Sequence, residues 1–124
     1  MEAMKLMDIG SPALEDVAYG LAHEMLKRKG SEIFDGDWMP GRRGMVAGDD
    51  GCLVFVDVSL DEGDGNGFEP PFKDRGRAEI CAYRWLFRYD GQDARVRFDS
   101  VQVKAMPSLK GFVKHIVNLY GRGD

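Results

Sequence analysis

The sequence predicts a single α/β domain with a mixed β-sheet flanked by helices, and three segments support this class. An apolar stripe at helical spacing runs through residues 11–30, after a capping serine and Pro12 and up to Gly30. A second helical stripe occupies residues 73–89. Between them, residues 52–60 are apolar on both faces of a strand, which is typical of a central strand that is covered on both sides.

The remaining segments complete the expected order of elements. Residues 31–38 form a weak strand signal, residues 44–47 a very short one, and Asp49-Asp50-Gly51 a turn signal between two apolar segments. Residues 95–103 alternate and then change phase, which predicts a strand with a bulge near Asp99 or Ser100. Residues 109–120 fit a helix by period and a strand by β-branched content, so both remain open. We expect residues 1–10 and the acidic, glycine-rich residues 61–71 to be mobile.

Composition limits the function classes. The chain has 124 residues and a net charge of −4, which argues against strong non-specific binding to phosphate backbones but leaves room for a local basic patch. Cys52 and Cys81 are far apart, so we expect two buried thiols and neither a disulfide scaffold nor a zinc site. We find no apolar run of the roughly 18 residues that a membrane span needs and no secretory signal, so we expect a cytoplasmic protein without a membrane partner.

Two carboxylates stand at positions that suggest a cleft. Asp57 interrupts the apolar run of the central strand, and an isolated buried carboxylate is costly unless it is paired, hydrogen-bonded or bound to metal. Asp57 therefore either binds a metal or pairs with an arginine or a backbone group. Glu15 lies at the rim of the first helical stripe, where it either reaches into the cleft or simply favours the helix dipole.

The second helix carries a basic stripe. Arg77, Arg84 and Arg88 fall within one narrow angular sector, and Lys73 and Arg75 precede them. Such a patch either contacts a phosphate backbone or forms a solvated face.

Five short motifs occur in order along the chain: 14–18 (LEDVA, similar to G-E-x-x-A), 37–38 (DW, similar to N-W), 53–59 (LVFVDVS, similar to L-V-F-V-E-V-K), 96–101 (VRFDSV, similar to R-F-D-x-V) and 115–120 (HIVNLY, similar to H-I-x-N-A-F). In this order they resemble the motifs of the YraN-like family of bacterial proteins. The resemblance implies a restriction-endonuclease-like, PD-(D/E)xK core. In that core two acids bind a divalent metal and a lysine helps to activate water.

The chain departs from this pattern at the predicted site. The resemblance places Asp57 at the metal-binding Glu and Ser59 at the lysine, while the family's E-I-D segment before the central strand is absent. The candidate catalytic residues are Asp57, Glu15 and the degenerate position Ser59. The candidate metal ligands are Asp57, Glu15 and Asp49, with Asp50 as a substitute for Asp49. Arg43 or Lys104 are candidates for the lost positive charge.

From this pattern we expect a nuclease-fold protein that no longer cuts and acts as a nucleic-acid-binding or accessory module. Arg77, Arg84 and Arg88 would contact phosphates, and branched or single-stranded DNA is the expected partner. We expect no bound metal, with Mg²⁺ or Mn²⁺ as the alternative. The other readings are an active metal-dependent endonuclease with relocated site residues, and a protein-interaction scaffold without a nucleic-acid role. Whether the chain is an enzyme stays open at this point.

Overall fold

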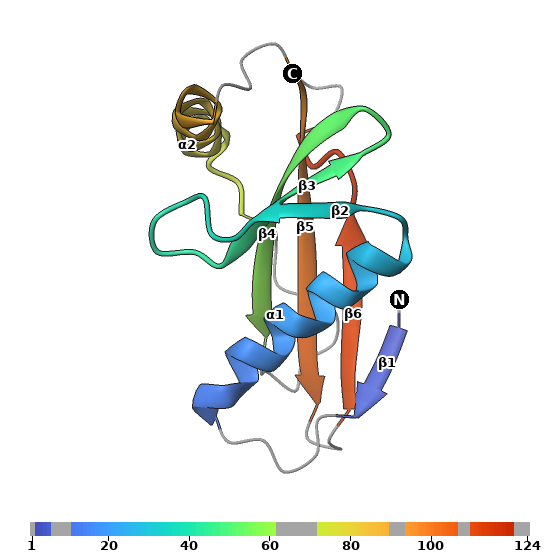
Figure 1. Ribbon diagram of the computed structural model, residues 1–124. Helices are drawn as coiled ribbons and strands as arrows, with labels where there is room; N and C mark the ends of the chain where they lie inside the picture. Colours follow the sequence, from blue (N-terminus) through green and yellow to red (C-terminus); the bar gives the residue numbers. More distant parts are fainter. Residues whose placement is uncertain (1, 6–10, 62–71, 90–93, 107–109, 121–124) are drawn as a thin grey trace.

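The computed structural model describes residues 2–5, 11–61, 72–89, 94–106 and 110–120 (Figure 1). Its elements are β1 (Glu2–Lys5), α1 (Ser11–Arg28), β2 (Glu32–Asp35), β3 (Gly44–Asp49), β4 (Cys52–Asp61), α2 (Arg75–Arg88), β5 (Arg95–Met106) and β6 (Lys110–Ile116). Both predicted helices and the predicted central strand are therefore present.

The strands form one six-stranded sheet in the order β1-β6-β5-β4-β3-β2. The β4–β5 pair is parallel and all the other pairs are antiparallel, so the sheet is mixed. Parallel neighbours need a crossover connection, and α2 lies in that connection. This arrangement confirms the predicted fold class, a mixed sheet flanked by helices, and it is consistent with a restriction-endonuclease-like core.

The β3–β4 hairpin follows from its two turn residues. Asp50 and Gly51 have φ values of 49° and 78°, and they connect the paired residues Asp49 and Cys52. Positive φ at both central positions is typical of the tight turn that matches the twist of a hairpin, and an aspartate followed by glycine tolerates it best. The predicted turn is therefore confirmed.

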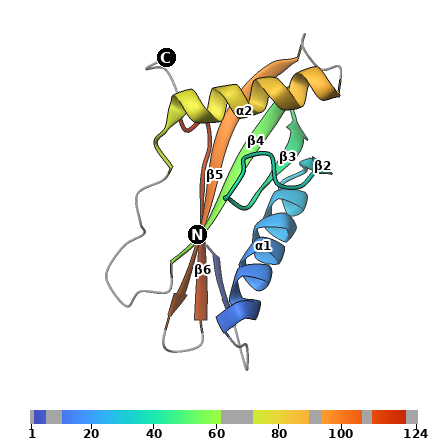
Figure 2. The same cartoon turned by 90° about the vertical axis from the view of Figure 1, so that its left-hand side faces the viewer.

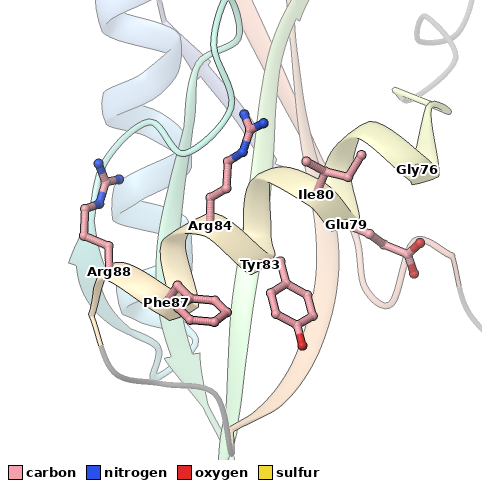
Figure 3. A pocket seen from close by; sticks show the side chains of 7 residues that line it. All are labelled: Gly76, Glu79, Ile80, Tyr83, Arg84, Phe87 and Arg88. Atoms are coloured by element: carbon pink, nitrogen blue, oxygen red, sulfur yellow. The ribbon is translucent and has the colours of Figure 1, made fainter.

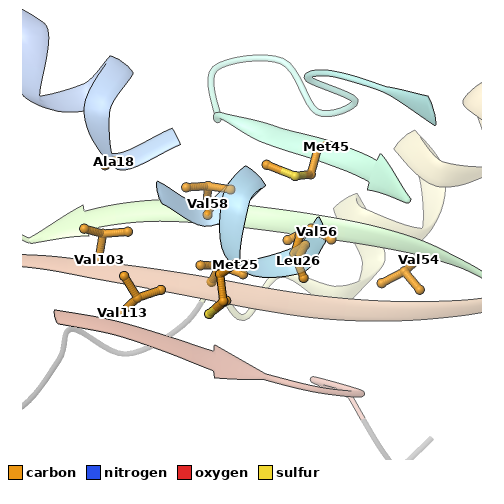
Figure 4. Packing of buried hydrophobic residues seen from close by; sticks show 11 residues of the cluster. Ala18, Met25, Leu26, Met45, Val54, Val56, Val58, Val103 and Val113 are labelled. Carbon is orange, nitrogen blue, oxygen red and sulfur yellow. The ribbon is translucent and has the colours of Figure 1, made fainter. Parts of the chain in front are cut away.

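Helix α1 covers one face of the sheet. Ala18, Met25 and Leu26 pack against valines of β4, β5 and β6 (Figure 4). The helix ends as predicted at Gly30, whose φ is 95°. The amide of Ser31 donates to the carbonyl of Leu26, which satisfies a carbonyl that the helix leaves free.

Helix α2 covers the opposite face, at the other end of the sheet (Figure 2). Its buried side chains Ala78, Cys81 and Trp85 pack with Phe55 of β4. Because side chains alternate along a strand, Phe55 points to α2 whereas its neighbours Val54 and Val56 point to α1. This double coverage is why β4 is apolar at nearly every position.

The predicted bulge in β5 is wrong. Residues 95–104 pair with residues 52–61 of β4 in one continuous register. The apolar pattern changes phase because each helix covers only part of the sheet. Phe98 packs with the α2 cluster, whereas Val101 and Val103 pack with the α1 cluster.

Both chain ends add strands to the sheet. The ambiguous segment 109–120 contains β6, which lies between β5 and β1 and buries Val113. The prediction of a flexible start is wrong for Glu2–Lys5, because these residues pair with β6. Residues 1 and 6–10 of that start lie outside the described residues. Of the predicted mobile loop 61–71, Asp61 is the last residue of β4 and pairs with Lys104, and residues 62–71 lie outside the described residues. Neither described helix has the length and apolar character to cross a membrane.

Candidate functional site

Asp57 lies in the middle of β4, paired laterally with Gly44 of β3 and Ser100 of β5. Its side chain is only 4% exposed, and both of its oxygens are held by one guanidinium group. Arg42 Nε donates to Oδ1 over 2.6 Å and Nη2 donates to Oδ2 over 2.8 Å. A planar guanidinium in this two-bond arrangement is among the strongest partners that a carboxylate has in proteins. Of the two predicted roles of Asp57, metal binding and pairing with an arginine, the geometry supports the pairing.

The loop between β2 and β3 places Arg42 by anchoring itself to β4. The indole Nε1 of Trp38 donates to the carbonyl of Val56 over 2.8 Å, and Asp37 Oδ1 accepts from the amide of Gly44 over 2.9 Å. The amide of Val58 donates to the carbonyl of Arg43. A side chain at position 44 would collide with the Val56 carbonyl and with the Trp38 ring, so this close approach requires glycine. The predicted D-W pair thus has a structural role beside Asp57.

A cleft of about 760 Å³ adjoins this ion pair. Two of the predicted site residues, Glu15 from α1 and Ser59 from β4, line it together with Arg42. Its further lining residues are Ala18, Asp37, Trp38, Met39, Pro40, Gly41, Arg43, Val58, Leu60 and Arg88. Asp57 does not line the cleft; it contacts Arg42, which does. The structure therefore brings Glu15 and Ser59 to one cleft, and Arg42 separates that cleft from Asp57.

The other predicted metal ligand, Asp49, lies elsewhere. It pairs with Cys52 at the far end of the hairpin, five positions along β4 from Asp57, which corresponds to about 17 Å. Its carboxylate accepts a hydrogen bond from Arg97 over 3.0 Å. Asp50 is exposed at the tip of the same turn. Neither acid is brought to Asp57.

The two predicted substitute cations also lie away from Asp57. Arg43 pairs with Asp16 over 3.3 Å and packs over the ring of Tyr19. Lys104 is buried, and its Nζ lies 3.8 Å from Asp61 Oδ2. The cation beside Asp57 comes instead from Arg42, the residue before Arg43, which the sequence reasoning missed.

The donor set at Asp57 does not fit a divalent metal of the kind that the family resemblance implies. Mg²⁺ and Mn²⁺ favour several oxygen ligands, usually with more than one carboxylate. Across the described ranges, no three His, Cys, Asp or Glu side chains gather closely enough to hold a metal ion. At Asp57 a guanidinium already neutralises the charge that would attract one. A buried hydroxyl lies on the neighbouring strand, Ser100 Oγ, and it has no hydrogen-bond partner within the described part of the chain.

A second buried carboxylate, Asp99 of β5, has a much fuller set of partners. Arg97 Nε and Nη2 donate to its two oxygens over 2.9 and 3.0 Å. The backbone amide of Asn118 donates to Oδ1 over 2.9 Å, and His115 Nε2 lies 2.8 Å from Oδ2. The other ring nitrogen of His115 lies 3.0 Å from Lys29 Nζ. These contacts link α1, β5 and the end of β6 around one carboxylate.

The electrostatics of this network follow from its donors. Burial raises the pKa of Asp99, but hydrogen bonds from His115, Arg97 and the Asn118 amide outweigh it and hold the pKa below its usual value. Hydrogen bonds to Asp99 raise the pKa of Arg97 further above its ordinary value. Because the Lys29 ammonium can only donate, Nδ1 of His115 accepts, and the proton lies on Nε2 toward Asp99.

The sequence contained a signal for this network. Arg97 and Asp99 are two apart on a strand and therefore project from the same face, as the structure places them. They lie in the R-F-D segment, and His115 and Asn118 lie in the H-I-x-N segment, the two segments that carried part of the family resemblance. Their convergence on one carboxylate needed the pairing of β5 with β6.

The predicted basic residues of α2 separate into two groups. Arg84 and Arg88 are exposed and line a shallow surface groove together with Ile80, Tyr83 and Phe87 (Figure 3). Arg77 is also exposed, but its guanidinium donates to the carbonyl of Pro40. Arg84 and Arg88 are thus available on one surface, while Arg77 tethers α2 to the loop that carries Arg42.

These features define a class of protein: a small α/β protein with a mixed sheet flanked by helices, consistent with a restriction-endonuclease-like core. No family model matches the chain. A UPF0102 protein from Nocardia farcinica (strain IFM 10152) is 31% identical to it over 101 residues, which cover 77% of this chain and 80% of that protein. The chain therefore belongs to the UPF0102 family, the YraN-like family that its motifs resemble.

Proposed function

We propose that this UPF0102 protein is a nuclease-fold protein that no longer cleaves and that acts as a nucleic-acid-binding or accessory module. The observation that carries the proposal is the bidentate ion pair of Arg42 with Asp57. Asp57 is the position at which the family pattern has a metal-binding Glu. In this chain a permanently charged guanidinium takes the place of the metal cation, since arginine stays protonated at any physiological pH.

The loss of the family's lysine supports the same conclusion. Ser59 carries no positive charge, and it lines the cleft beside Arg42. A metal-dependent hydrolase needs a cation that polarises the phosphate and a group that positions the attacking water. Arg42 is bound to Asp57 through two nitrogens and cannot coordinate a water as a metal does.

The binding half of the proposal depends on α2. Arg84 and Arg88 project from its outer surface, and segment 73–88 has five basic and two acidic side chains although the whole chain has a net charge of −4. A local excess of positive charge on one surface is the electrostatic footprint of phosphate binding.

Calorimetric titration of Mn²⁺ tests the catalytic half. We expect no binding to the unaltered protein. The decisive variants are Asp57→Asn and, as a matched control on an exposed turn, Asp50→Asn. Binding at micromolar to sub-millimolar affinity that is lost in Asp57→Asn and kept in Asp50→Asn would contradict the proposal. It would favour the active endonuclease built on Asp57 and Glu15, with cleavage that Asp57→Asn abolishes.

Binding to labelled branched and single-stranded DNA at low salt tests the other half. We expect measurable binding that weakens when Arg77, Arg84 and Arg88 are changed together to Ala. Arg95→Ala, an exposed arginine at the start of β5, is the matched control and should bind as the unaltered protein does. Absence of binding, or binding that the triple change leaves intact, would contradict a nucleic-acid role and leave the protein-interaction scaffold as the better description.

A further inference from the structure

The outer surface of α2 exposes an apolar and aromatic stripe. Ile80, Tyr83 and Phe87 are 56%, 62% and 68% exposed, although large apolar side chains usually pack inside a domain. They line one groove, and they are neighbours along the helix at spacings of three and four residues. A contiguous exposed apolar patch of this kind usually marks a binding surface, whereas single scattered apolar residues on a helix surface do not.

The two rings of this stripe form adjacent platforms. The ring centroids of Tyr83 and Phe87 are 6.0 Å apart and the ring planes are tilted by 30°. Both rings project from one edge of α2, and the side chains of Arg84 and Arg88 extend from the opposite edge in this view (Figure 3). The rings and the cations therefore line one groove from two edges of the helix.

We infer that this surface of α2 binds single-stranded nucleic acid, with bases stacked on Tyr83 and Phe87 and phosphates paired with Arg84 and Arg88. The inference rests on the proposed nucleic-acid-binding function and adds the class of ligand that this surface takes. Proteins that bind single strands combine a basic surface with aromatic side chains, and each base–aromatic stack contributes about 1–3 kcal/mol.

Two other occupants fit these side chains less well. The bases of a duplex are stacked on one another inside the helix. A duplex can therefore bind the arginines through its phosphates, but its bases cannot stack on Tyr83 and Phe87. A second copy of the chain would bury the rings but would bring two basic segments together, because segment 73–88 carries an excess of positive charge. Like charges in contact across an interface are unfavourable. The charge of this surface complements a polyanion.

Fluorescence anisotropy at low salt with a labelled oligothymidine tests the inference. A length of about 15 nucleotides suits a small single-strand site. A duplex of the same length is the comparison ligand. The variant Tyr83→Ala/Phe87→Ala should weaken single-strand binding about tenfold or more and leave duplex binding nearly unchanged. Tyr83→Phe should retain affinity, because the ring remains. Phe34→Ala is the matched control: it removes an exposed ring from β2, outside this groove.

The outcomes separate this inference from the function on which it rests. If Arg84→Ala/Arg88→Ala weakens binding while loss of both rings does not, the basic surface binds nucleic acid but stacking is overturned. If the unaltered protein binds neither ligand, both proposals fail. Analytical ultracentrifugation provides the last arm: a dimer that becomes monomeric in Tyr83→Ala/Phe87→Ala would assign the stripe to a second copy of the chain and overturn the inference.

Discussion

Two buried carboxylates on neighbouring strands, Asp57 of β4 and Asp99 of β5, are held in different ways. Asp99 is fully buried and receives donors from Arg97, His115 and the Asn118 backbone. Asp57 is paired with Arg42 alone among the contacts described here, and the Arg42 side chain is 30% exposed. Arg97 comes from the same strand as Asp99, whereas Arg42 reaches Asp57 from a loop.

Because of this difference, we regard Asp99 as a structural carboxylate and Asp57 as a carboxylate that lies next to a cleft. Arg97 and His115 lie on strands and Asn118 follows β6, and their donors occupy both oxygens of Asp99. The network therefore ties β5 to the end of β6. The Arg42–Asp57 pair borders the cleft that Glu15 and Ser59 line. We therefore expect substitutions at Asp99 to act on stability and substitutions at Arg42 to act on both stability and the chemistry of the cleft.

Asp99→Ala should have the largest effect. It removes a buried acceptor, leaves the Asn118 amide without its partner and leaves the Arg97 guanidinium with Asp49 in place of two carboxylates, which costs about 4 kcal/mol of unfolding free energy. Urea unfolding followed by circular dichroism measures it, and Asp50→Ala on the exposed turn is the control. A loss below about 1 kcal/mol would mean that the network is not structural.

Arg42→Ala should be the next largest, because it leaves Asp57 buried without its cation. We expect a loss of about 3 kcal/mol, and Asp57→Asn in the same background should recover part of it by removing the charge. Comparing the two single variants with the double variant gives the coupling energy of the pair. Additive losses would contradict a direct ion pair.

Protonation of Asp99 at low pH should reduce the free energy of unfolding by less than Asp99→Ala does. The folded-state pKa of Asp99 lies below its unfolded value, so its contribution is fully present above the unfolded pKa of about 3.9. It is lost as the pH falls below that value and through the folded-state pKa. Unfolding free energies between about pH 7 and pH 3 should fall more steeply for the unaltered protein than for Asp99→Asn. Parallel curves would show that Asp99 does not carry this dependence.

Substitutions of His115 and Lys29, at the outer end of the Asp99 network, should reduce the free energy of unfolding least. His115→Ala removes a donor to Asp99 and should cost about 1–2 kcal/mol, whereas Lys29→Ala removes an exposed cation and should cost less than about 0.5 kcal/mol. Thermal unfolding distinguishes them. Equal losses from the two substitutions would mean that Lys29 has a larger role than its exposure suggests.

The sequence by itself determined the local elements of this protein. Helical spacing and the Gly30 signal gave α1, the Asp50-Gly51 turn gave the β3–β4 hairpin, and the apolar run gave β4 its central place. These features depend on neighbours in the chain, so periodicity and turn chemistry are sufficient to predict them. The same reasoning identified Asp57 as an anomaly and placed Glu15 at the rim of a helical stripe, while the family resemblance pointed to Ser59.

Only the tertiary structure decided what holds each buried carboxylate. Arg42 is 15 residues from Asp57, and His115 is 16 residues from Asp99, so no local pattern pairs them. The pairing of β3 with β4 and of β5 with β6 brings them together, and it also explains the phase change in β5, where two helices cover different parts of the sheet. Contacts between strands depend on register and packing, which a single sequence does not specify.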